Sequence, residues 1–399
     1  MNFLEADLNI SAPMIESLSI VGKFVGVVSG FATVGLLLAM AFLLFDEKGN
    51  LSKSAKDLRP IAAITALLWV TGQALNILTT LANILGSSLS GALDATSIKS
   101  FLTQISLGKY MLAQLFIALV IALFVVRIKK TMTTNLLLLL SIIASVLPLF
   151  ESHSTSSGSH SLAIGSLVIH VVALSFWVGG LIAITALSPI DRAVALPRFS
   201  ALALWAVIAV VASGTANAWV RLNFANSWNS GYARLILLKI VLTIVLIYFG
   251  YINRKHLSGK MELNAIKLGR LLFSEVVIMI LVTLAGTRLS VMQPPDRGNE
   301  QLFDAGLAVA GIATPPPPSL WRLLTLYDPD ALIIGLLLTA LALYIKAVVT
   351  LSRRGVKWPV GRTVSFALGI SVIDFATSGG LGVYAKFSFE YHMIAHMLL

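Results

Sequence analysis

Long apolar runs separated by short polar connections occupy almost the whole chain. Each run is continuous, without the apolar–polar alternation of a transmembrane β-strand, so the pattern predicts spanning helices and argues against a β-barrel. The predicted spans cover residues 18–45, 60–82, 106–128, 132–150, 161–187, 201–221, 234–252, 269–290, 330–350 and 363–380. An eleventh apolar segment begins near Ser388 and extends only to Leu399. The expected fold is therefore an all-α, polytopic membrane helix bundle with about ten spans and a truncated eleventh.

Basic residues collect in alternate connections, which predicts an orientation. Most Lys and Arg residues fall in the connections 46–59, 127–131, 188–200, 253–268 and 351–362. Because basic loops stay in the cytoplasm, we expect the N-terminus outside and a multi-pass protein of the cytoplasmic membrane, in contact with lipid. The net charge of +11, in a chain that is 57% hydrophobic and 12% charged, is explained by these loops, so no nucleic-acid partner is expected.

Several kinds of chemistry find no support in the sequence. The chain has no cysteine, so disulfides and thiolate metal sites are excluded. It has no P-loop, no nucleophile elbow and no dinucleotide-binding fingerprint, and we expect it not to be an enzyme.

A histidine within the fifth predicted span is the first candidate. His170 lies about 14 Å along a helix from Ser161, near the middle of a hydrocarbon layer roughly 30 Å thick. An ionisable group at that depth is costly and usually has a partner or a function. Trp177 follows two turns later on the same face, and Gly179 and Gly180 would let another helix approach closely. The alternative for His170 is a structural hydrogen bond to another helix.

Two further histidines flank the polar loop that precedes this span. His153 and His160 could converge if the loop folds back over the start of the helix, and imidazole suits copper, zinc, iron and nickel. His160 and His170 are about 15 Å apart along one helix, too far to share an ion. The alternative for His153 is a solvated loop residue.

The C-terminal segment holds a second cluster. His392 and His396 are four residues apart, so they neighbour each other on one helical face and could hold one metal ion. Met393 and Met397 widen the arc to roughly 140° with thioethers, which favour Cu(I). The alternatives are methionines that only pack and histidines that lie at the interface by accident.

Other polar residues in the spans are candidates for a relay or for supporting contacts. Glu275, Asp374 and Lys239 should each face the bundle or a wet cavity. For Lys239 the alternative is an ion pair that only joins helices. Met292, at the outer end of the eighth span, is a possible soft ligand or a packing residue.

Two stretches of the sequence each resemble a known family. The stretch from Gly158-Ser-His160 through His170 to Trp177-Val-Gly-Gly180, with Leu238-Lys239, Asn253-Arg254, Glu275 and Pro294-Pro295, resembles the copper-resistance D (CopD) membrane family. The stretch from Trp358-Pro359 through Gly379-Gly-Leu-Gly-Val-Tyr384 to His392-Met-Ile-Ala-His396 resembles the start of CtaG-type cytochrome c oxidase assembly proteins. Fusions of the two are familiar in actinobacteria. The resemblance implies a CopD-like domain over 1–295, a Pro-rich extracytoplasmic linker over 296–329 and an incomplete CtaG-like domain over 330–399.

The resemblance also implies a function. We expect copper, as Cu(I) or Cu(II), to be captured by outer His and Met ligands, passed inward through His170 with Glu275 as a deeper partner, or delivered toward oxidase assembly. An extracytoplasmic copper-binding protein or oxidase subunits are the expected partners. Two alternatives stay open, namely a haem-binding electron carrier and an assembly scaffold that moves no metal.

Overall fold

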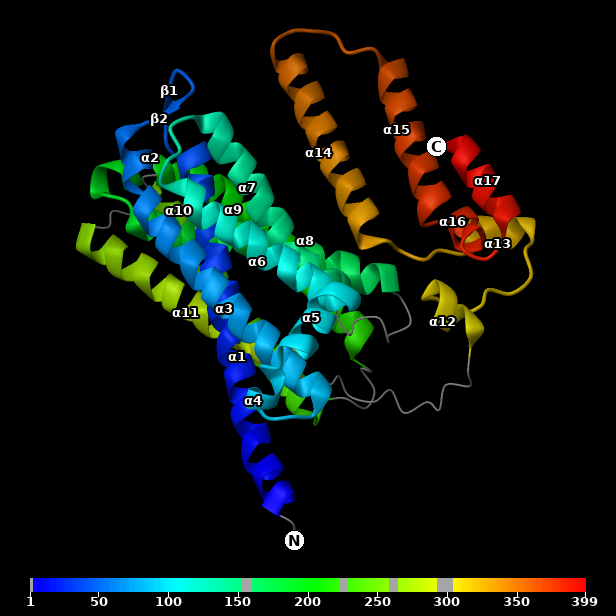
Figure 1. The fold of residues 1–399 in the computed structure, drawn as a ribbon. Helices are drawn as coiled ribbons and strands as arrows, with labels where there is room; N and C mark the ends of the chain where they lie inside the picture. The colour runs from blue at the N-terminus through cyan, green and yellow to red at the C-terminus, as the bar shows by residue number, and fades with distance from the viewer. Residues whose placement is uncertain (1–2, 152–159, 223–227, 258–264, 293–303) are drawn as a thin grey trace. The chain divides into compact units, whose positions relative to one another are not determined.

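The computed structural model describes residues 3–151, 160–222, 228–257, 265–292 and 304–399. It is helical almost throughout, which confirms the predicted fold class (Figure 1). Within those ranges ten helical segments are long and apolar enough to cross a membrane. They are Pro13–Leu43, Lys53–Leu85, Ser106–Val125, Thr131–Glu151, Ser161–Ala186, Pro189–Arg221, Gly231–His256, Ile266–Val291, Ala331–Arg353 and Val360–Thr377. The chain is therefore a multi-pass membrane protein. The predicted N-out orientation remains a prediction.

The chain forms two compact units. The first comprises Met1–Glu151, His170–Val211 and Asn223–Pro295, and the second comprises Ser152–Ile169, Ala212–Leu222 and Asp296–Leu399. The helices α8 (His160–Ala186) and α9 (Pro189–Arg221) therefore contribute to both. The domain limits expected at residues 295 and 329 remain a prediction.

The first unit is built around a long N-terminal helix. Helix α1 (Phe3–Leu38) continues as a π-helix, η1 (Ala39–Leu43), and runs beside α3 (Arg59–Leu85) over much of its length (Figure 1). The remaining elements of its N-terminal part are β1 (Asp46–Glu47), β2 (Asn50–Leu51), α2 (Lys53–Asp57), α4 (Leu89–Ala92), α5 (Ala95–Gln104), α6 (Ser106–Val125), α7 (Thr131–Val146) and the 3₁₀ turn η2 (Leu147–Glu151). Helices α10 (Gly231–Leu257) and α11 (Ala265–Val291) pack together, and α11 also packs on α1.

The connection between α8 and α9 is shorter than predicted. Residues 188–200 were expected to form a loop, but α9 begins at Pro189. The Ser188 hydroxyl accepts a hydrogen bond from the Asp191 backbone N–H at 3.2 Å and donates to the Asp191 carboxylate at 2.7 Å. Serine before the helix and proline at its first position are strong start signals. The Arg192 guanidinium donates to the carbonyls of Ile184, Thr185 and Leu187, which satisfies the last turn of α8.

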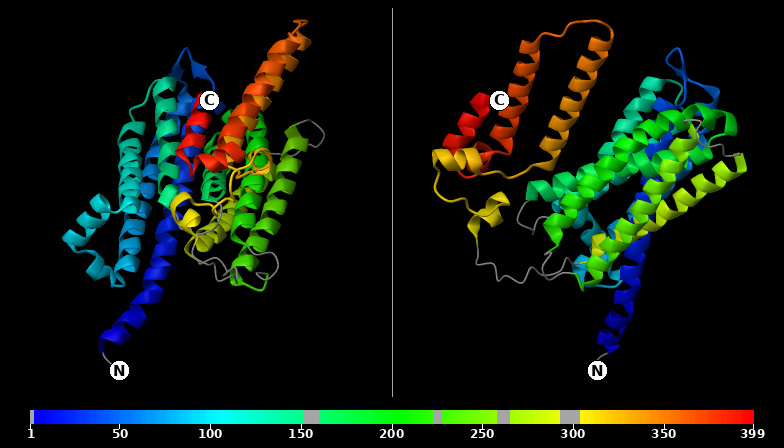
Figure 2. Two further views of the ribbon diagram at one scale, coloured as in Figure 1. Left: turned by 90° about the vertical axis from the view of Figure 1, so that its right-hand side faces the viewer. Right: turned by 180° about the vertical axis from the view of Figure 1, so that it is seen from behind.

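The second unit contains a helical hairpin and several short helices. Its elements in residues 304–399 are α12 (Ala305–Ala310), α13 (Leu320–Thr325), α14 (Ala331–Arg353), α15 (Val360–Thr377), α16 (Gly380–Ala385) and α17 (Phe389–Leu398). Helices α14 and α15 lie side by side, as Figure 1 and the right-hand view of Figure 2 show. Toward one end of the pair, the Tyr344 hydroxyl donates to Thr363 Oγ1 at 2.9 Å and accepts from Trp358 Nε1 at 2.8 Å. Toward the other end, the Tyr327 hydroxyl donates to Asp374 Oδ1 at 2.9 Å.

Candidate functional site

His170 is held by a backbone carbonyl of the next helix. Its Nδ1 lies 3.2 Å from the Val210 carbonyl oxygen on α9. A carbonyl oxygen only accepts, so Nδ1 must carry the proton in this bond, and a neutral imidazole then has its lone pair on Nε2. Metal-binding histidines commonly donate their other ring N–H to a carbonyl in this way. The contact therefore fits both of the predicted roles, a helix-joining hydrogen bond and an oriented ligand.

Close helix packing fixes the segment that follows His170. Trp177 is only 7% exposed and belongs to the main apolar core. A Cβ on Gly179 would overlap the Phe31 carbonyl oxygen of α1, and a Cβ on Gly180 would overlap the Phe199 ring of α9. Neither position tolerates a side chain without movement. The prediction that this glycine pair admits another helix is confirmed.

Lys239 of α10 lies near Gly286 of α11 and near His170. Its Nζ would lie 3.4 Å from a Cβ built on Gly286, so the amine packs over a glycine of α11. It is also near enough to His170 for their charges to interact. A protonated amine there would repel any cation that approached His170.

Glu275 forms a separate polar pair. The side chain of Glu275 on α11 is 5% exposed, and its Oε1 accepts a hydrogen bond from Asn253 Nδ2 on α10 at 2.9 Å. The prediction that Glu275 faces the bundle is confirmed. Asn253 Oδ1 is buried and has no hydrogen-bond partner within the described part of the chain. Glu275 and Gly286 are about 16 Å apart along α11, so the carboxylate and the Lys239 amine occupy different depths.

The outer ligands are described only in part. His153 lies outside the described residues, and for His160, the first residue of α8, only the backbone is described. Their predicted convergence remains a prediction. The structure does show a polar contact between α8 and α9 in the second unit. Asn217 Nδ2 donates to Ser166 Oγ at 2.9 Å, while the buried Asn217 Oδ1 has no partner among the described residues.

The C-terminal cluster lies on one exposed face of α17. The imidazole rings of His392 and His396 are edge to face, with centroids 4.6 Å apart. The side chains of Met393 and Met397 are exposed as well, whereas Ala395 is buried. The helix thus turns its small apolar residue inward and its possible ligands outward. Two histidines on one turn suit one shared ion, but they do not suit haem, whose axial ligands approach from opposite faces.

The remaining candidates have packing contacts. Asp374 accepts the Tyr327 hydrogen bond, and burial, followed by this carboxylate, raises the pKa of Tyr327. Tyr327 therefore keeps its proton and remains a donor at neutral pH. Met292 Cε would lie 3.6 Å from a Cβ on Gly231 at the start of α10. No group of three or more His, Asp or Glu side chains arranged to hold a metal occurs among the described residues.

Family comparisons divide the chain into three matched stretches. A family described as "Copper resistance protein D-like, N-terminal domain" matches residues 14–162, and "Copper resistance protein D" matches residues 193–289. "Cytochrome c oxidase caa3 assembly factor (Caa3_CtaG)" matches residues 342–399. The chain is thus a fusion of CopD and CtaG-type sequence.

The matched ranges distribute the candidates unevenly. Lys239, Asn253 and Glu275 fall within the second CopD match, and the α17 cluster falls within the CtaG match. His170 and Trp177 lie between the two CopD matches, in a stretch that neither covers. The resemblance noted around His170 therefore rests on its own residues.

Similarity to curated relatives extends over a smaller part of the chain than the family matches do. An uncharacterized protein of Mycobacterium bovis is 35% identical over 112 residues, which are 28% of this chain and 17% of that protein. A second, from Mycobacterium leprae, is 35% identical over 100 residues, 24% of this chain and 15% of that protein. The chain thus spans less than a fifth of the length of these relatives. No solved structure gives a significant match.

Two site features were missed by reasoning from the sequence. The Val210 contact is made by a backbone carbonyl, which no residue pattern identifies. Asn253 and Asn217 did leave a signal, because each is an amide within or beside an apolar run. A buried amide in a spanning helix needs a polar partner and so should have been counted with the ionisable residues.

Proposed function

We propose that this chain carries copper across the cytoplasmic membrane, with outer His and Met ligands that capture the ion and His170 as a transient ligand within the membrane. The family matches support a copper-related membrane function or a role in oxidase assembly. The direction of transport, the ligands and the energy source belong to the proposal.

The observation that carries the proposal is the hydrogen bond between His170 and Val210. It directs the Nδ1 proton to a carbonyl and leaves Nε2 as the nitrogen that would bind copper. The nearby Lys239 charge opposes tight retention, which suits a step on a path better than a resident metal centre. Glu275, with the Asn253 amide, then supplies oxygen atoms or a proton-accepting group at a second depth.

The experiment is copper accumulation in cells that produce the chain. Wild type is compared with a His160→Ala/His170→Ala double variant at equal amounts in the membrane. We expect the wild type to change cellular copper and the double variant to match cells without the protein. Equal accumulation in wild type and double variant would exclude transport through these histidines.

A second function is favoured by the CtaG-type match. That match, together with the exposed His392 and His396 on α17, supports delivery of copper to oxidase subunits. A scaffold that only recruits those subunits would require no histidine, so oxidase assembly that persists in a His392→Ala/His396→Ala variant distinguishes the scaffold from copper delivery.

A further inference from the structure

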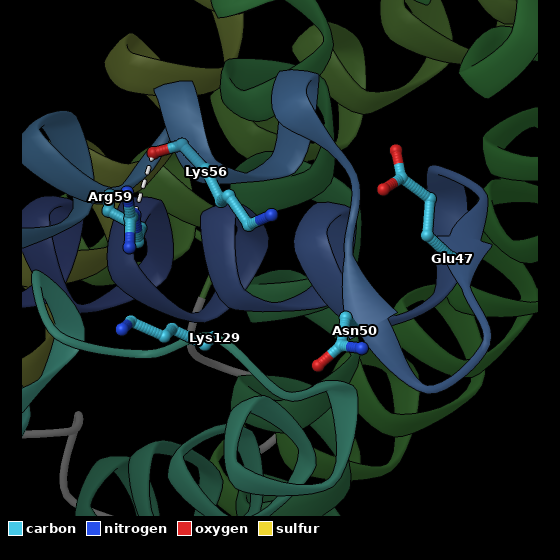
Figure 3. Close-up of a pocket in the computed structure, with 5 residues that line it drawn as sticks. All are labelled: Glu47, Asn50, Lys56, Arg59 and Lys129. Carbon is cyan, nitrogen blue, oxygen red and sulfur yellow. Dashed lines mark hydrogen bonds between the residues drawn. The ribbon is translucent and has the colours of Figure 1, made fainter.

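Three cationic side chains from separate segments line one open pocket in the first unit. The pocket has a volume of about 360 Å³ and is lined by Glu47, Asn50, Lys56, Arg59 and Lys129. Figure 3 shows Lys56, Arg59 and Lys129 grouped at one side, with Glu47 on the hairpin set apart from them. The volume lies within the roughly 300–1,000 Å³ typical of small-ligand sites.

Backbone hydrogen bonds hold the segments that form this pocket. The hairpin of β1 and β2 is tied to the connection between α6 and α7, because the Leu51 N–H donates to the Lys129 carbonyl at 2.8 Å and the Thr131 N–H donates to the Gly49 carbonyl at 3.0 Å. Arg59 joins two of the segments as well. Its Nε donates to the Lys56 carbonyl at 2.9 Å, and its Nη1 donates to the Ile128 carbonyl at 2.9 Å. The guanidinium is therefore oriented before any ligand arrives.

The charge of the pocket is only partly balanced. Its lining has three cations against the single carboxylate of Glu47. Within the described ranges, the ion pairs join Arg288 to Glu16 and Lys386 to Asp328, and none involves Lys56, Arg59 or Lys129. Cations that converge without a carboxylate partner attract an anion.

The pocket lies where four spans end. The spans Pro13–Leu43 and Ser106–Val125 finish just before its lining residues, and Lys53–Leu85 and Thr131–Glu151 begin among or just after them. Large apolar side chains flank it in sequence and are exposed, among them Phe42, Phe124 and Met132. Clustered cations at a membrane surface attract the phosphates of anionic lipids.

We propose that this pocket binds a phosphate group, supplied by an anionic phospholipid or by free phosphate. Arg59 provides the N–H donors of its Nη2, whose direction is set by the bonds that Nε and Nη1 make. Lys56 and Lys129 provide mobile charges, and the Asn50 amide can donate at the rim. The proposal is independent of copper and of the orientation of the chain, since the pocket lies at a membrane surface in either orientation.

The test measures binding to the purified full chain in a zwitterionic detergent. The probes are short-chain phosphatidylglycerol, short-chain phosphatidylcholine and inorganic phosphate, each titrated by calorimetry. The pocket variant is Lys56→Gln/Lys129→Gln, and the matched control is Lys53→Gln/Lys130→Gln, which removes two lysines from the same segments outside the pocket. At roughly fivefold per lysine, the pocket variant should bind about 25-fold more weakly, and the control should bind as wild type does.

Each outcome decides the proposal. Binding of phosphatidylglycerol that is lost only in the pocket variant supports a lipid source, and the same result with inorganic phosphate supports a soluble source. Absence of binding by both anions, or equal weakening in the two variants, overturns the proposal. Equal melting temperatures of the variants without ligand establish that both fold, and Lys129→Glu, a change at an exposed position, repeats the test if the double variant melts early.

Discussion

The two histidine regions differ in how firmly their side chains are held. His170 is bonded to a carbonyl of α9 within a tightly packed part of the first unit, near an amine of α10. His392 and His396 face outward on α17, and their two rings meet edge to face. A held imidazole has a fixed nitrogen and a fixed direction, whereas an exposed pair can adjust to the ion. The first arrangement suits passage of one cargo, and the second suits capture or release.

The largest effect is expected where packing is tightest. Gly179→Ala places a methyl group against the Phe31 carbonyl, and overpacking of this kind costs about 1–3 kcal/mol or more. We expect loss of folded protein from the membrane, measured by thermal melting in detergent. Gly250→Ala is the control, because nothing lies within 4 Å of the added Cβ. Equal melting temperatures of the two variants would contradict the close approach of α1 and α8.

The next effect concerns transport through His170. His170→Ala should lower copper accumulation at least tenfold while the outer ligands still bind copper. His170→Met should retain part of the activity if the cargo is Cu(I), because a thioether is an acceptable soft ligand. His170→Asn keeps a hydrogen-bonding side chain but is a poor copper ligand.

The pattern of the last two variants decides the role of His170. Near-normal accumulation in His170→Asn, with none in His170→Met, means that the hydrogen bond to Val210 is the whole role of this residue. His170 would then be a structural residue and not a copper ligand, so its comparison with the exposed His392 and His396 pair as a second ligand site would no longer hold.

A more moderate effect on copper affinity is expected from removing the Lys239 amine. Replacing Lys239 by Met removes the amine that acts on His170. We expect copper to bind more tightly, by roughly tenfold for a removed interaction of about 1.4 kcal/mol, and to be released more slowly. Binding is measured on the purified protein with a Cu(I) chelator. Unchanged affinity in Lys239→Met would show that the amine does not influence the ion, and Lys255→Met, near the other end of α10, is the control.

The smallest effect is expected in the exposed cluster. His392→Ala and His396→Ala should weaken copper binding by similar factors, about tenfold each, because one imidazole alone is a poor chelate. Competition with a Cu(I) chelator measures this, and Glu390→Gln on the same helix is the control. If both histidine variants bind copper with the affinity and stoichiometry of wild type, the pair is a packing feature.

The sequence predicted the positions of the spans well but not the contacts between them. Apolar runs located the ten spans found among the described residues, since length and hydropathy decide insertion. They failed at residues 188–200, where α9 continues past the apolar run into polar sequence. The start signals at Ser188 and Pro189 identify that helix, so this error was avoidable.

The contacts depend on how helices are aligned against one another. Glu275 was predicted to face inward, and it does, but its pairing with Asn253 depends on the register between α10 and α11. Lipid-facing runs of Leu, Ile and Val carry little information about register. The partner of His170 is a backbone carbonyl, which every residue possesses, so only the packed structure identifies Val210.

Two sets of hydrogen bonds, here called clamps, join α14 and α15 and have a consequence for membrane insertion during synthesis. The Tyr344 hydroxyl of α14 is hydrogen-bonded to Thr363 and Trp358, at and just before the start of α15. The Tyr327 hydroxyl, just before α14, is hydrogen-bonded to Asp374 near the end of α15. Each clamp uses only residues of this hairpin and its immediate flank. The pair can therefore leave the insertion machinery as a unit whose register is already set, before other helices pack.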